Sequence, residues 1–439
     1  FKFIPVSAEL DISGGTGRVK VVLQAATYGT GAVDDTPAGE ANSPYNFPVL
    51  NFPNTVLPGV NAGLGLGINT GTLAVFDSTN GKVHISTNFD RLAAGGTPDF
   101  TGYALSLTGT LAAFAVRADS PKYLASAGAV NGYIATTSQV RTISDIFSAR
   151  TLGTAYSYAT GAAVGASQVQ LQTERGNPDW ALAVAYNDTA GVNAYRTTDG
   201  GASWSAESSL PTFYDSLLPQ NAGVWKAGLW MNADGSGSAI VSAFGATGTA
   251  PGGDFWQTSD YGATWTKITT SGWDTGDWLA CCIIKPLNRS DVVFHGWVEN
   301  IAGTGYGHFY RIVGTTATDI TPTFGGGDYG ISFFSFAQRS MSVADDDPNC
   351  LAVIGYDRGS GEYGVFQTFN ALAAAPTWNA VVTPATSLGY RGVYYVNRTT
   401  MYLFGLSGAM AITKYVGGSW VLNEMAISGC GTIVGICGG

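Results

Sequence analysis

The chain has 439 residues, of which 45% are hydrophobic and only 12% are charged, and its formal net charge at pH 7 is −10. A negatively charged chain without a basic stripe argues against a nucleic-acid binder and against a protein that adheres to anionic membranes. No apolar run approaches the length of about eighteen residues that predicts a transmembrane helix, so we expect no membrane insertion. Short alternating apolar runs prevail over helical heptads, which predicts an all-β chain with many tight turns.

The first 66 residues differ in character from the rest of the chain. They contain a strand-like run, VKVVLQAATYG, and then a stretch rich in proline, asparagine and glycine. We interpret residues 1–66 either as an N-terminal arm that reaches a neighbouring subunit or as a segment that closes the main domain.

From residue 67 onwards one unit recurs: a strand, a short polar hairpin, a second strand, a turn and a short strand. The paired strands begin near residues 73, 123, 181, 238, 292, 351 and 401. A period of roughly 50 to 60 residues, with four strands expected in each unit, predicts a β-propeller, because radial stacking buries both faces of each sheet. We therefore predict seven four-stranded antiparallel blades over residues 67–425, with six or eight blades left open. Residues 426–439 are expected to add an outer strand or to lead to a further domain.

Two copies of the unit carry the same six-residue turn, DGGASW at 199–204 and DYGATW at 260–265. The aspartate can accept hydrogen bonds from backbone N–H groups of its own turn, the glycine permits an unusual backbone angle, and the tryptophan buries a large ring. These roles are structural rather than catalytic. We assign them to Asp199, Gly201, Trp204, Asp260, Gly262 and Trp265.

The stretches TTDGGASW and TSDYGATW resemble the Asp-box, or BNR repeat, of sialidase-like propellers, whose pattern is Ser/Thr-x-Asp-x-Gly-x-x-Trp. TKYVGGSW keeps the end of the pattern but has Tyr415 in place of the aspartate, and STNFDRLA keeps only Asn88. The resemblance implies that each box lies between the third and fourth strands of a blade, opposite the usual ligand face. Propellers of this kind include sialidases, other glycoside hydrolases, sorting receptors, photosystem assembly factors and phage appendage proteins, so the resemblance implies a fold rather than an activity.

In such a propeller, ligand-binding residues come from the links between blades and from the hairpins between second and third strands. The link SGWDTGDWLACC (271–282) offers aromatic faces and carboxylates, which suit the C–H faces and hydroxyl groups of a sugar. The alternative is that Trp278 packs in the core. Our candidate ligand-binding residues are Trp273, Asp274, Asp277, Trp278, Asp254, Tyr329 and Arg339.

The run ADDDPN offers three carboxylates, Asp345, Asp346 and Asp347, as candidate calcium ligands, with a solvated turn as the alternative. We expect no other metal or cofactor. Cys430 and Cys437 flank a short loop, and a disulfide between them is left open.

The early Arg-Ile-Pro signature of sialidases is absent, and we assign no catalytic residue. Low charge with many Ser, Thr, Gly and Asn residues is typical of extracellular and virion proteins. We therefore predict a non-catalytic module of a surface filament or phage tail, which binds a glycan or a protein surface and acts as an assembly subunit or homo-oligomer. The alternative is a glycoside hydrolase with carboxylates contributed by several blades.

Overall fold

The chain forms two compact units, which we describe separately. One comprises Phe1–Leu50 with Val416–Ser419, and its sheet is an antiparallel hairpin of β1 (Phe3–Asp11) and β2 (Arg18–Ala25). The interpretation of residues 1–66 as an arm or a closing segment stays a prediction. The computed structural model describes residues 3–11, 18–25, 72–116, 130–158, 169–174, 177–187, 191–207, 228–231, 236–242, 255–271, 278–286, 289, 291–299, 306–324, 327–330, 340–344, 347–357, 362–383 and 387–438.

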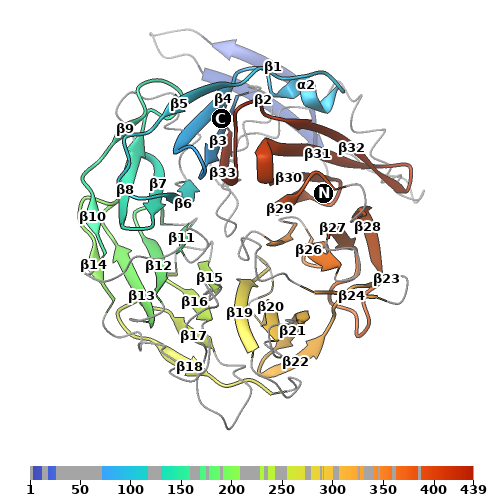
Figure 1. Cartoon of the computed structure of the whole chain (residues 1–439). Helices are drawn as coiled ribbons and strands as arrows, with labels where there is room; N and C mark the ends of the chain where they lie inside the picture. Colours follow the sequence, from blue (N-terminus) through green and yellow to red (C-terminus); the bar gives the residue numbers. More distant parts are fainter. Residues whose placement is uncertain are drawn as a thin grey trace. The chain divides into compact units, whose positions relative to one another are not determined.

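In the described part of the second unit, seven antiparallel sheets surround a common centre, which confirms the predicted seven-bladed propeller (Figure 1). We number the blades along the chain and give the strands of each blade from the centre outwards. Blade 1 contains β33 (Ile433–Gly438), β3 (Leu73–Asp77), β4 (Lys82–Ser86) and β5 (Thr101–Ala104). Blade 2 contains β6 (Leu111–Val116), β7 (Val130–Thr136), β8 (Gln139–Ser144) and β10 (Tyr156–Ser157), with β9 (Thr151–Leu152) also paired to β8. Blade 3 contains β11 (Val169–Thr173), β12 (Ala181–Asn187), β13 (Gly191–Thr197) and β14 (Ser205–Ala206).

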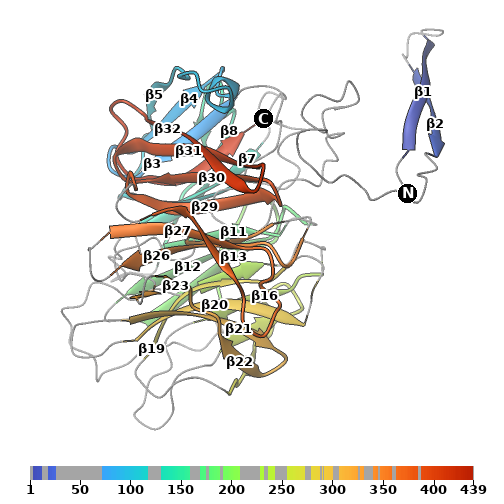
Figure 2. The ribbon, with the colours of Figure 1, turned by 90° about the vertical axis from the view of Figure 1, so that its right-hand side faces the viewer.

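The remaining four blades follow the same order, and Figure 2 shows the sheets of neighbouring blades from the side, in successive layers. Blades 4 and 5 contain β15 (Gly228–Met231), β16 (Ala239–Ser242), β17 (Phe255–Thr258) and β18 (Thr266–Ile268); and β19 (Trp278–Ile284), β20 (Val292–Glu299), β21 (Tyr306–Val313) and β22 (Thr316–Asp319). Blade 6 contains β25 (Met341–Val343), β26 (Leu351–Asp357), β27 (Glu362–Thr368) and β28 (Trp378–Val382), and it is extended by β23 (Thr323–Phe324) and β24 (Gly327–Gly330). Blade 7 contains β29 (Tyr390–Asn397), β30 (Thr400–Gly405), β31 (Ala409–Val416) and β32 (Ser419–Ala426).

The first strands of the blades form the centre of the propeller. Neighbouring first strands contact one another in the order β33, β6, β11, β15, β19, β25 and β29. The first strands β6 (LAAFAV) and β11 (VQLQT) are buried along their whole length, whereas the fourth strand β5 is exposed along its whole length. Each blade therefore runs from a buried centre to a solvated rim.

The hydrophobic core lies between blades rather than within single sheets. Between blades 1 and 2, the rings of Phe76 and Phe114 stack with their centroids 3.9 Å apart. Between blades 2 and 3, Tyr133 meets Trp204 edge to face with the centroids 5.7 Å apart. Because each sheet covers the faces of its neighbours, the stability of one blade depends on the blades beside it.

Buried polar side chains also link the first strands. The amide of Gln172 in β11 accepts a hydrogen bond from the N–H of Met231 in β15 at 3.1 Å and donates one to the carbonyl of Leu229. Thr173 donates its hydroxyl hydrogen to the carbonyl of Val116 in β6 at 2.7 Å. These side chains satisfy backbone groups at the buried centre, where an unpaired group would be costly.

The ring closes through β33, which pairs with β3 and becomes the first strand of blade 1. The register places Ile436 opposite Val75 and Cys437 opposite Ala74. The C-terminal segment thus supplies an inner strand, whereas the sequence had left open an outer strand or a link to a further domain. The physical reason is its apolar character: Ile433, Val434 and Ile436 are fully buried, which a rim position would not allow.

The Cys430–Cys437 disulfide that the sequence left open does not form, since Cys430 is a free, buried thiol. Cys430 precedes β33, whereas Cys437 lies near the far end of that strand. A strand rises about 3.3 Å per residue, so the two Cα atoms are separated by far more than the roughly 6 Å that a disulfide spans.

Helix is scarce in the part of the chain that the structure describes. The α-helix α2 (Asp90–Ala93) has four residues and lies between β4 and β5, and the 3-10 helix η5 (Leu406–Gly408) has three and joins β30 to β31. Neither has the length and apolar character that crossing a bilayer would require.

Replacing Ile436 by alanine should lower the free energy of unfolding by about 2 to 5 kcal/mol, because the Ile436 side chain is fully buried in the ring-closing strand and its loss leaves a cavity. Urea denaturation of the full chain measures the change. Val421→Ala is the control, since Val421 lies in β32 with 49% of its surface exposed, and it should shift the unfolding free energy by less than about 0.5 kcal/mol. Equal losses in the two variants would contradict the closure described here.

Candidate functional site: two faces of the propeller

The antiparallel order of each blade sorts its loops onto two faces. The links between blades and the hairpins between second and third strands begin and end on one face, which we call the link face. The turns between third and fourth strands lie on the opposite face, which we call the turn face. In blade 5, Trp278 pairs with Glu299 at the link face, and Ile284 pairs with Phe294 towards the turn face.

Of the seven candidate ligand-binding residues, the structure describes the backbone of two. Trp278 begins β19 opposite Glu299 of β20, and Tyr329 lies in β24 opposite Asp357 of β26. Because Glu299 and Asp357 end the second strands of blades 5 and 6, both aromatic residues lie at link-face edges of neighbouring blades. Trp273, Asp274, Asp277, Asp254 and Arg339 lie outside the described residues, and the assignment of all seven stays a prediction.

Asp199 lies on the turn face, between β13 and β14. Its Oδ1 accepts hydrogen bonds from the hydroxyl of Thr197 at 2.7 Å and from the N–H of Ser203 at 2.9 Å, and its Oδ2 accepts one from the Ser203 hydroxyl at 2.5 Å. Gly201 has a φ of 83°, and a Cβ there would lie 2.4 Å from Thr142 of blade 2. Glycine is therefore needed for both the backbone angle and the close approach of the next sheet.

Asp260 repeats this geometry between β17 and β18. Its Oδ1 accepts hydrogen bonds from the hydroxyl of Thr258 at 2.7 Å and from the N–H of Thr264 at 2.8 Å, and its Oδ2 accepts one from the Thr264 hydroxyl at 2.6 Å. Gly262 has a φ of 81°. The aspartate thus binds the two ends of its own turn to each other.

The tryptophan after each of these turns packs inwards. Trp204 and Trp265 are buried, with 8% and 9% of their surfaces exposed. Each belongs to a hydrophobic cluster that includes side chains of neighbouring blades. The indole therefore ties the turn to the core between the sheets.

A third turn of the same geometry occurs in blade 6, where the sequence has an asparagine. The Oδ1 of Asn370 accepts hydrogen bonds from the hydroxyl of Thr368 at 2.7 Å and from the N–H of Thr377 at 2.8 Å. Trp378 follows directly, and its Nε1 donates to the carbonyl of Ile320 in the preceding blade at 3.0 Å. The amide oxygen of Asn370 occupies the role of an aspartate oxygen.

A fourth turn of this kind occurs in blade 1. The Oδ1 of Asn88 accepts hydrogen bonds from the hydroxyl of Ser86 at 3.0 Å and from the N–H of Asp99 at 2.9 Å, and the aromatic Phe100 follows. The sequence showed the asparagine but not its partner. The missed signal is a Ser/Thr-x-Asp/Asn start followed, after a variable insertion, by the N–H donor and an aromatic residue. The donor lies four residues after Asp199 and Asp260, seven after Asn370 and eleven after Asn88.

Two arginines connect such turns to the preceding blade. The Nη1 of Arg196 in β13 donates to the carbonyl of Tyr261 at 2.7 Å, directly after the aspartate of the blade 4 turn. The Nη1 of Arg311 in β21 donates to the carbonyl of Ala371 at 3.2 Å, directly after the asparagine of the blade 6 turn. Burial lowers the pKa of Arg311. In both cases the third strand of one blade holds the turn of the next.

The electrostatics of the two aspartates suit this structural role. Hydrogen bonds from the Ser203 hydroxyl and N–H hold the pKa of Asp199 at about 2, and those from Thr264 hold the pKa of Asp260 at about 2. A general acid needs a pKa near the working pH, and an aspartate reaches such a value only when its pKa is raised. The pKa values of Asp199 and Asp260 are lowered instead.

The candidate calcium ligands Asp345 and Asp346 lie outside the described residues. The third, Asp347, accepts a hydrogen bond from the N–H of Asn349 at 2.9 Å and lies 3.6 Å from the Nη1 of Arg398. The calcium site stays a prediction.

Within the described ranges, one group of three side chains has the spacing of metal ligands, and the sequence did not reveal it. It consists of Asp77, His84 and Cys430, whose ligand atoms all lie within 4.8 Å of one another. The spacing along the chain gave no signal, because Cys430 joins the others only through ring closure.

No family model and no curated protein matches the sequence. Solved structures match the fold. The GH74 xyloglucanase from Xanthomonas campestris has a TM-score of 0.50 at 12% identity over 87% of this chain, and the GH74 enzyme from Niastella koreensis has 0.47 at 13% over 88%. The chain spans 55% of the length of each. A protein from Lactobacillus plantarum has a TM-score of 0.51 at 8% identity, over 83% of this chain and 98% of its own. At these identities the similarity shows the β-propeller fold alone.

Replacing Asp260 by asparagine should destabilise the chain by about 1 kcal/mol at pH 7, because the turn loses a charged acceptor. The folded pKa of Asp260 is about 2, below the usual value near 4, so its stabilising effect is present above pH 4 and is lost as the pH falls towards 2. Urea denaturation at pH 7 and pH 3 should therefore show a smaller difference between variant and wild type at pH 3. A difference that stays constant or grows at pH 3 would rule out the ionised carboxylate as its source.

The converse change, Asn370→Asp, should preserve or raise stability at pH 7, because a carboxylate can accept the same hydrogen bonds from Thr368 and Thr377 near the Arg311 guanidinium. Any gain should disappear as the pH falls from about 4 towards 2. The same denaturation series tests it, with Asn370→Ala as the control that loses both hydrogen bonds at either pH. A loss at pH 7 as large as that of Asn370→Ala would show that the turns are not equivalent.

Proposed function

We propose that the chain is a non-catalytic module of an extracellular surface or a virion, which binds a glycan or a protein and assembles with it or with further copies. The proposal rests on one observation: the four carboxylates named next accept hydrogen bonds that stabilise the fold. Asp199 and Asp260 hold turns, as shown above. Asp319 accepts a hydrogen bond from His308 at 2.7 Å, and Asp291 accepts two from Arg289 at 2.8 Å.

A glycoside hydrolase needs two carboxylates about 5 to 10 Å apart beside the scissile bond, one of them with a raised pKa. The carboxylates named above have lowered pKa values, because hydrogen bonds stabilise their charged forms. This argues for the binding module over the hydrolase. The GH74 similarity does not favour the hydrolase at 12% identity, because the fold hosts several functions.

The link before β19 is the best candidate for the binding surface. In the sequence, Trp273, Asp274 and Asp277 come just before β19, a first strand that begins at the link face, opposite the face that carries the turns of blades 3 and 4. Indole faces stack on the C–H faces of sugars, and carboxylates accept hydrogen bonds from hydroxyl groups. The low charge of the chain, 12%, fits a surface exposed outside the cell.

A glycan array and a panel of chromogenic glycosides, both applied to the full chain, test the proposal. We expect retention of at least one glycan class without turnover, and a loss of affinity of about tenfold or more in Trp273→Ala, which corresponds to about 1.4 kcal/mol. Asp260→Asn on the opposite face is the matched control and should keep wild-type affinity. Turnover that a single Asp277→Asn or Asp274→Asn substitution abolishes would replace the binding module by the hydrolase.

A further inference from the structure

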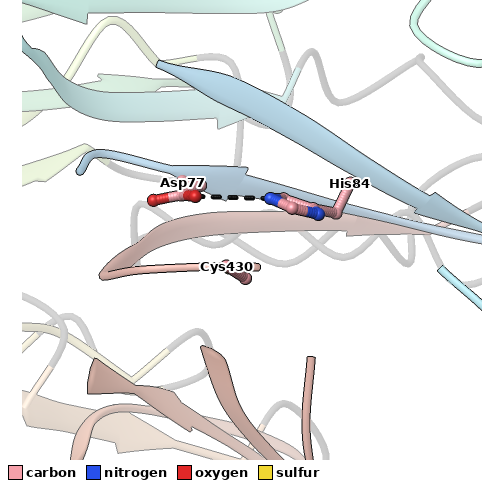
Figure 3. Close-up of side chains that lie close together, drawn as sticks. All are labelled: Asp77, His84 and Cys430. Atoms are coloured by element: carbon pink, nitrogen blue, oxygen red, sulfur yellow. Dashed lines mark hydrogen bonds and ion pairs between the residues drawn. The ribbon is translucent and has the colours of Figure 1, made fainter. Parts of the chain in front are cut away.

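Three side chains with different chemistry meet where the propeller closes. Asp77 ends β3, His84 lies in the paired strand β4, and Cys430 precedes β33 (Figure 3). All three are buried, with 0%, 3% and 8% of their surfaces exposed. The turns and the candidate binding link described above use none of them.

The distances suit a small divalent ion. The Nε2 of His84 lies 3.3 Å from the Oδ2 of Asp77. One ligand atom from each of Asp77, His84 and Cys430 lies within 4.8 Å of the other two. A tetrahedral zinc ion with bonds of about 2.0 to 2.2 Å to nitrogen and oxygen keeps these ligand atoms roughly 3.3 to 3.5 Å apart. A thiolate with an imidazole is the donor set that zinc prefers over calcium or magnesium.

The surroundings hold the Asp77 carboxylate in one orientation. Its Oδ2 accepts hydrogen bonds from the Nδ2 of Asn80 at 2.7 Å and from the N–H of Gly431 at 3.0 Å, and its Oδ1 accepts one from the N–H of Thr79 at 3.0 Å. Ligand carboxylates in metal sites are commonly oriented by such outer hydrogen bonds. The Asp77 carboxylate would therefore lose little conformational freedom when it binds an ion.

We propose that Asp77, His84 and Cys430 bind one divalent ion of the zinc type, which fastens the ring closure of the propeller. Two ligands come from the hairpin of β3 and β4, and the third comes from the segment before the C-terminal strand. The remaining tetrahedral position is left to water. Because the side chains are buried, the role is to stabilise the closed ring rather than to activate a substrate.

The protonation states set the pH dependence of binding. Burial opposes the charge on Asp77, but hydrogen bonds from His84, Asn80 and Gly431 outweigh it and hold the pKa of Asp77 at about 2. The ion must displace the proton of the Cys430 thiol, so its affinity should rise with pH across the neutral range.

Cobalt titration of the reduced, chelator-treated full chain tests the site, because a cobalt–thiolate bond gives a charge-transfer absorption band. We expect one Co²⁺ per chain, a band that Zn²⁺ removes by competition, and tighter binding at pH 8 than at pH 6. Cys430→Ser should abolish the band, and His84→Gln should weaken binding at least tenfold. Cys350→Ser is the matched control, since Cys350 is another free, buried cysteine outside the cluster, and should leave the band unchanged.

Absence of uptake by the wild-type chain, or a band that persists in Cys430→Ser, would overturn the proposal. Should Cys430→Ser fail to fold, thermal unfolding of the wild type gives an independent answer. The unfolding temperature should rise with Zn²⁺ concentration and fall again when chelator is added. An unfolding temperature that does not respond to Zn²⁺ would equally overturn it.

Discussion

Pairing of β33 with β3 is the interaction on which the rest of the propeller depends. Without it, β3 would present an unpaired edge at the buried centre, and the clusters on both sides of blade 1 would be open to water. The hairpin turn at Asp77 forms two hydrogen bonds with the chain before β33. The Asp77 carboxylate accepts one from the N–H of Gly431, and the N–H of Ser78 donates the other to the carbonyl of Thr432 at 2.8 Å. The first and last described segments of the propeller are thereby held in one sheet.

A propeller built from apolar sheets still needs polar contacts to set how the sheets meet. Gln172 matches both the donor and the acceptor of a neighbouring first strand, and Arg196 and Arg311 reach a carbonyl at a fixed place in the next blade's turn. Hydrophobic burial alone has no direction, whereas these bonds tolerate little sliding. They fix the register between blades, while the core provides most of the stabilisation.

The repeat spacing and the two Asp-x-Gly turns predicted the propeller, because both reflect local chemistry that recurs from blade to blade. The place of the C-terminal strand could not be predicted, because its partner β3 lies more than 350 residues earlier. The sequence showed Asn88 as the remaining residue of the turn pattern, but it did not show that the N–H of Asp99 is its hydrogen-bond donor. A pattern of fixed length does not allow for the insertion between them. The Asp77 cluster was missed for the same reason as the closure: sequence spacing carries no trace of it. Five of the seven candidate ligand-binding residues lie outside the described ranges, and Trp278 and Tyr329 are described by their backbone alone, so the assignment of all seven stays a prediction.

The four turns of this kind in the described residues share a hydroxyl two residues before the Asp or Asn side chain and one N–H after it. Everything between the two is free to change in length, as the inserted helix α2 in blade 1 illustrates. In blade 1 the insertion lengthens the turn and leaves both hydrogen bonds of Asn88 in place. Evolution, or a protein engineer, can therefore insert a foreign peptide between Asn88 and Asp99 and display it on the rim of the propeller.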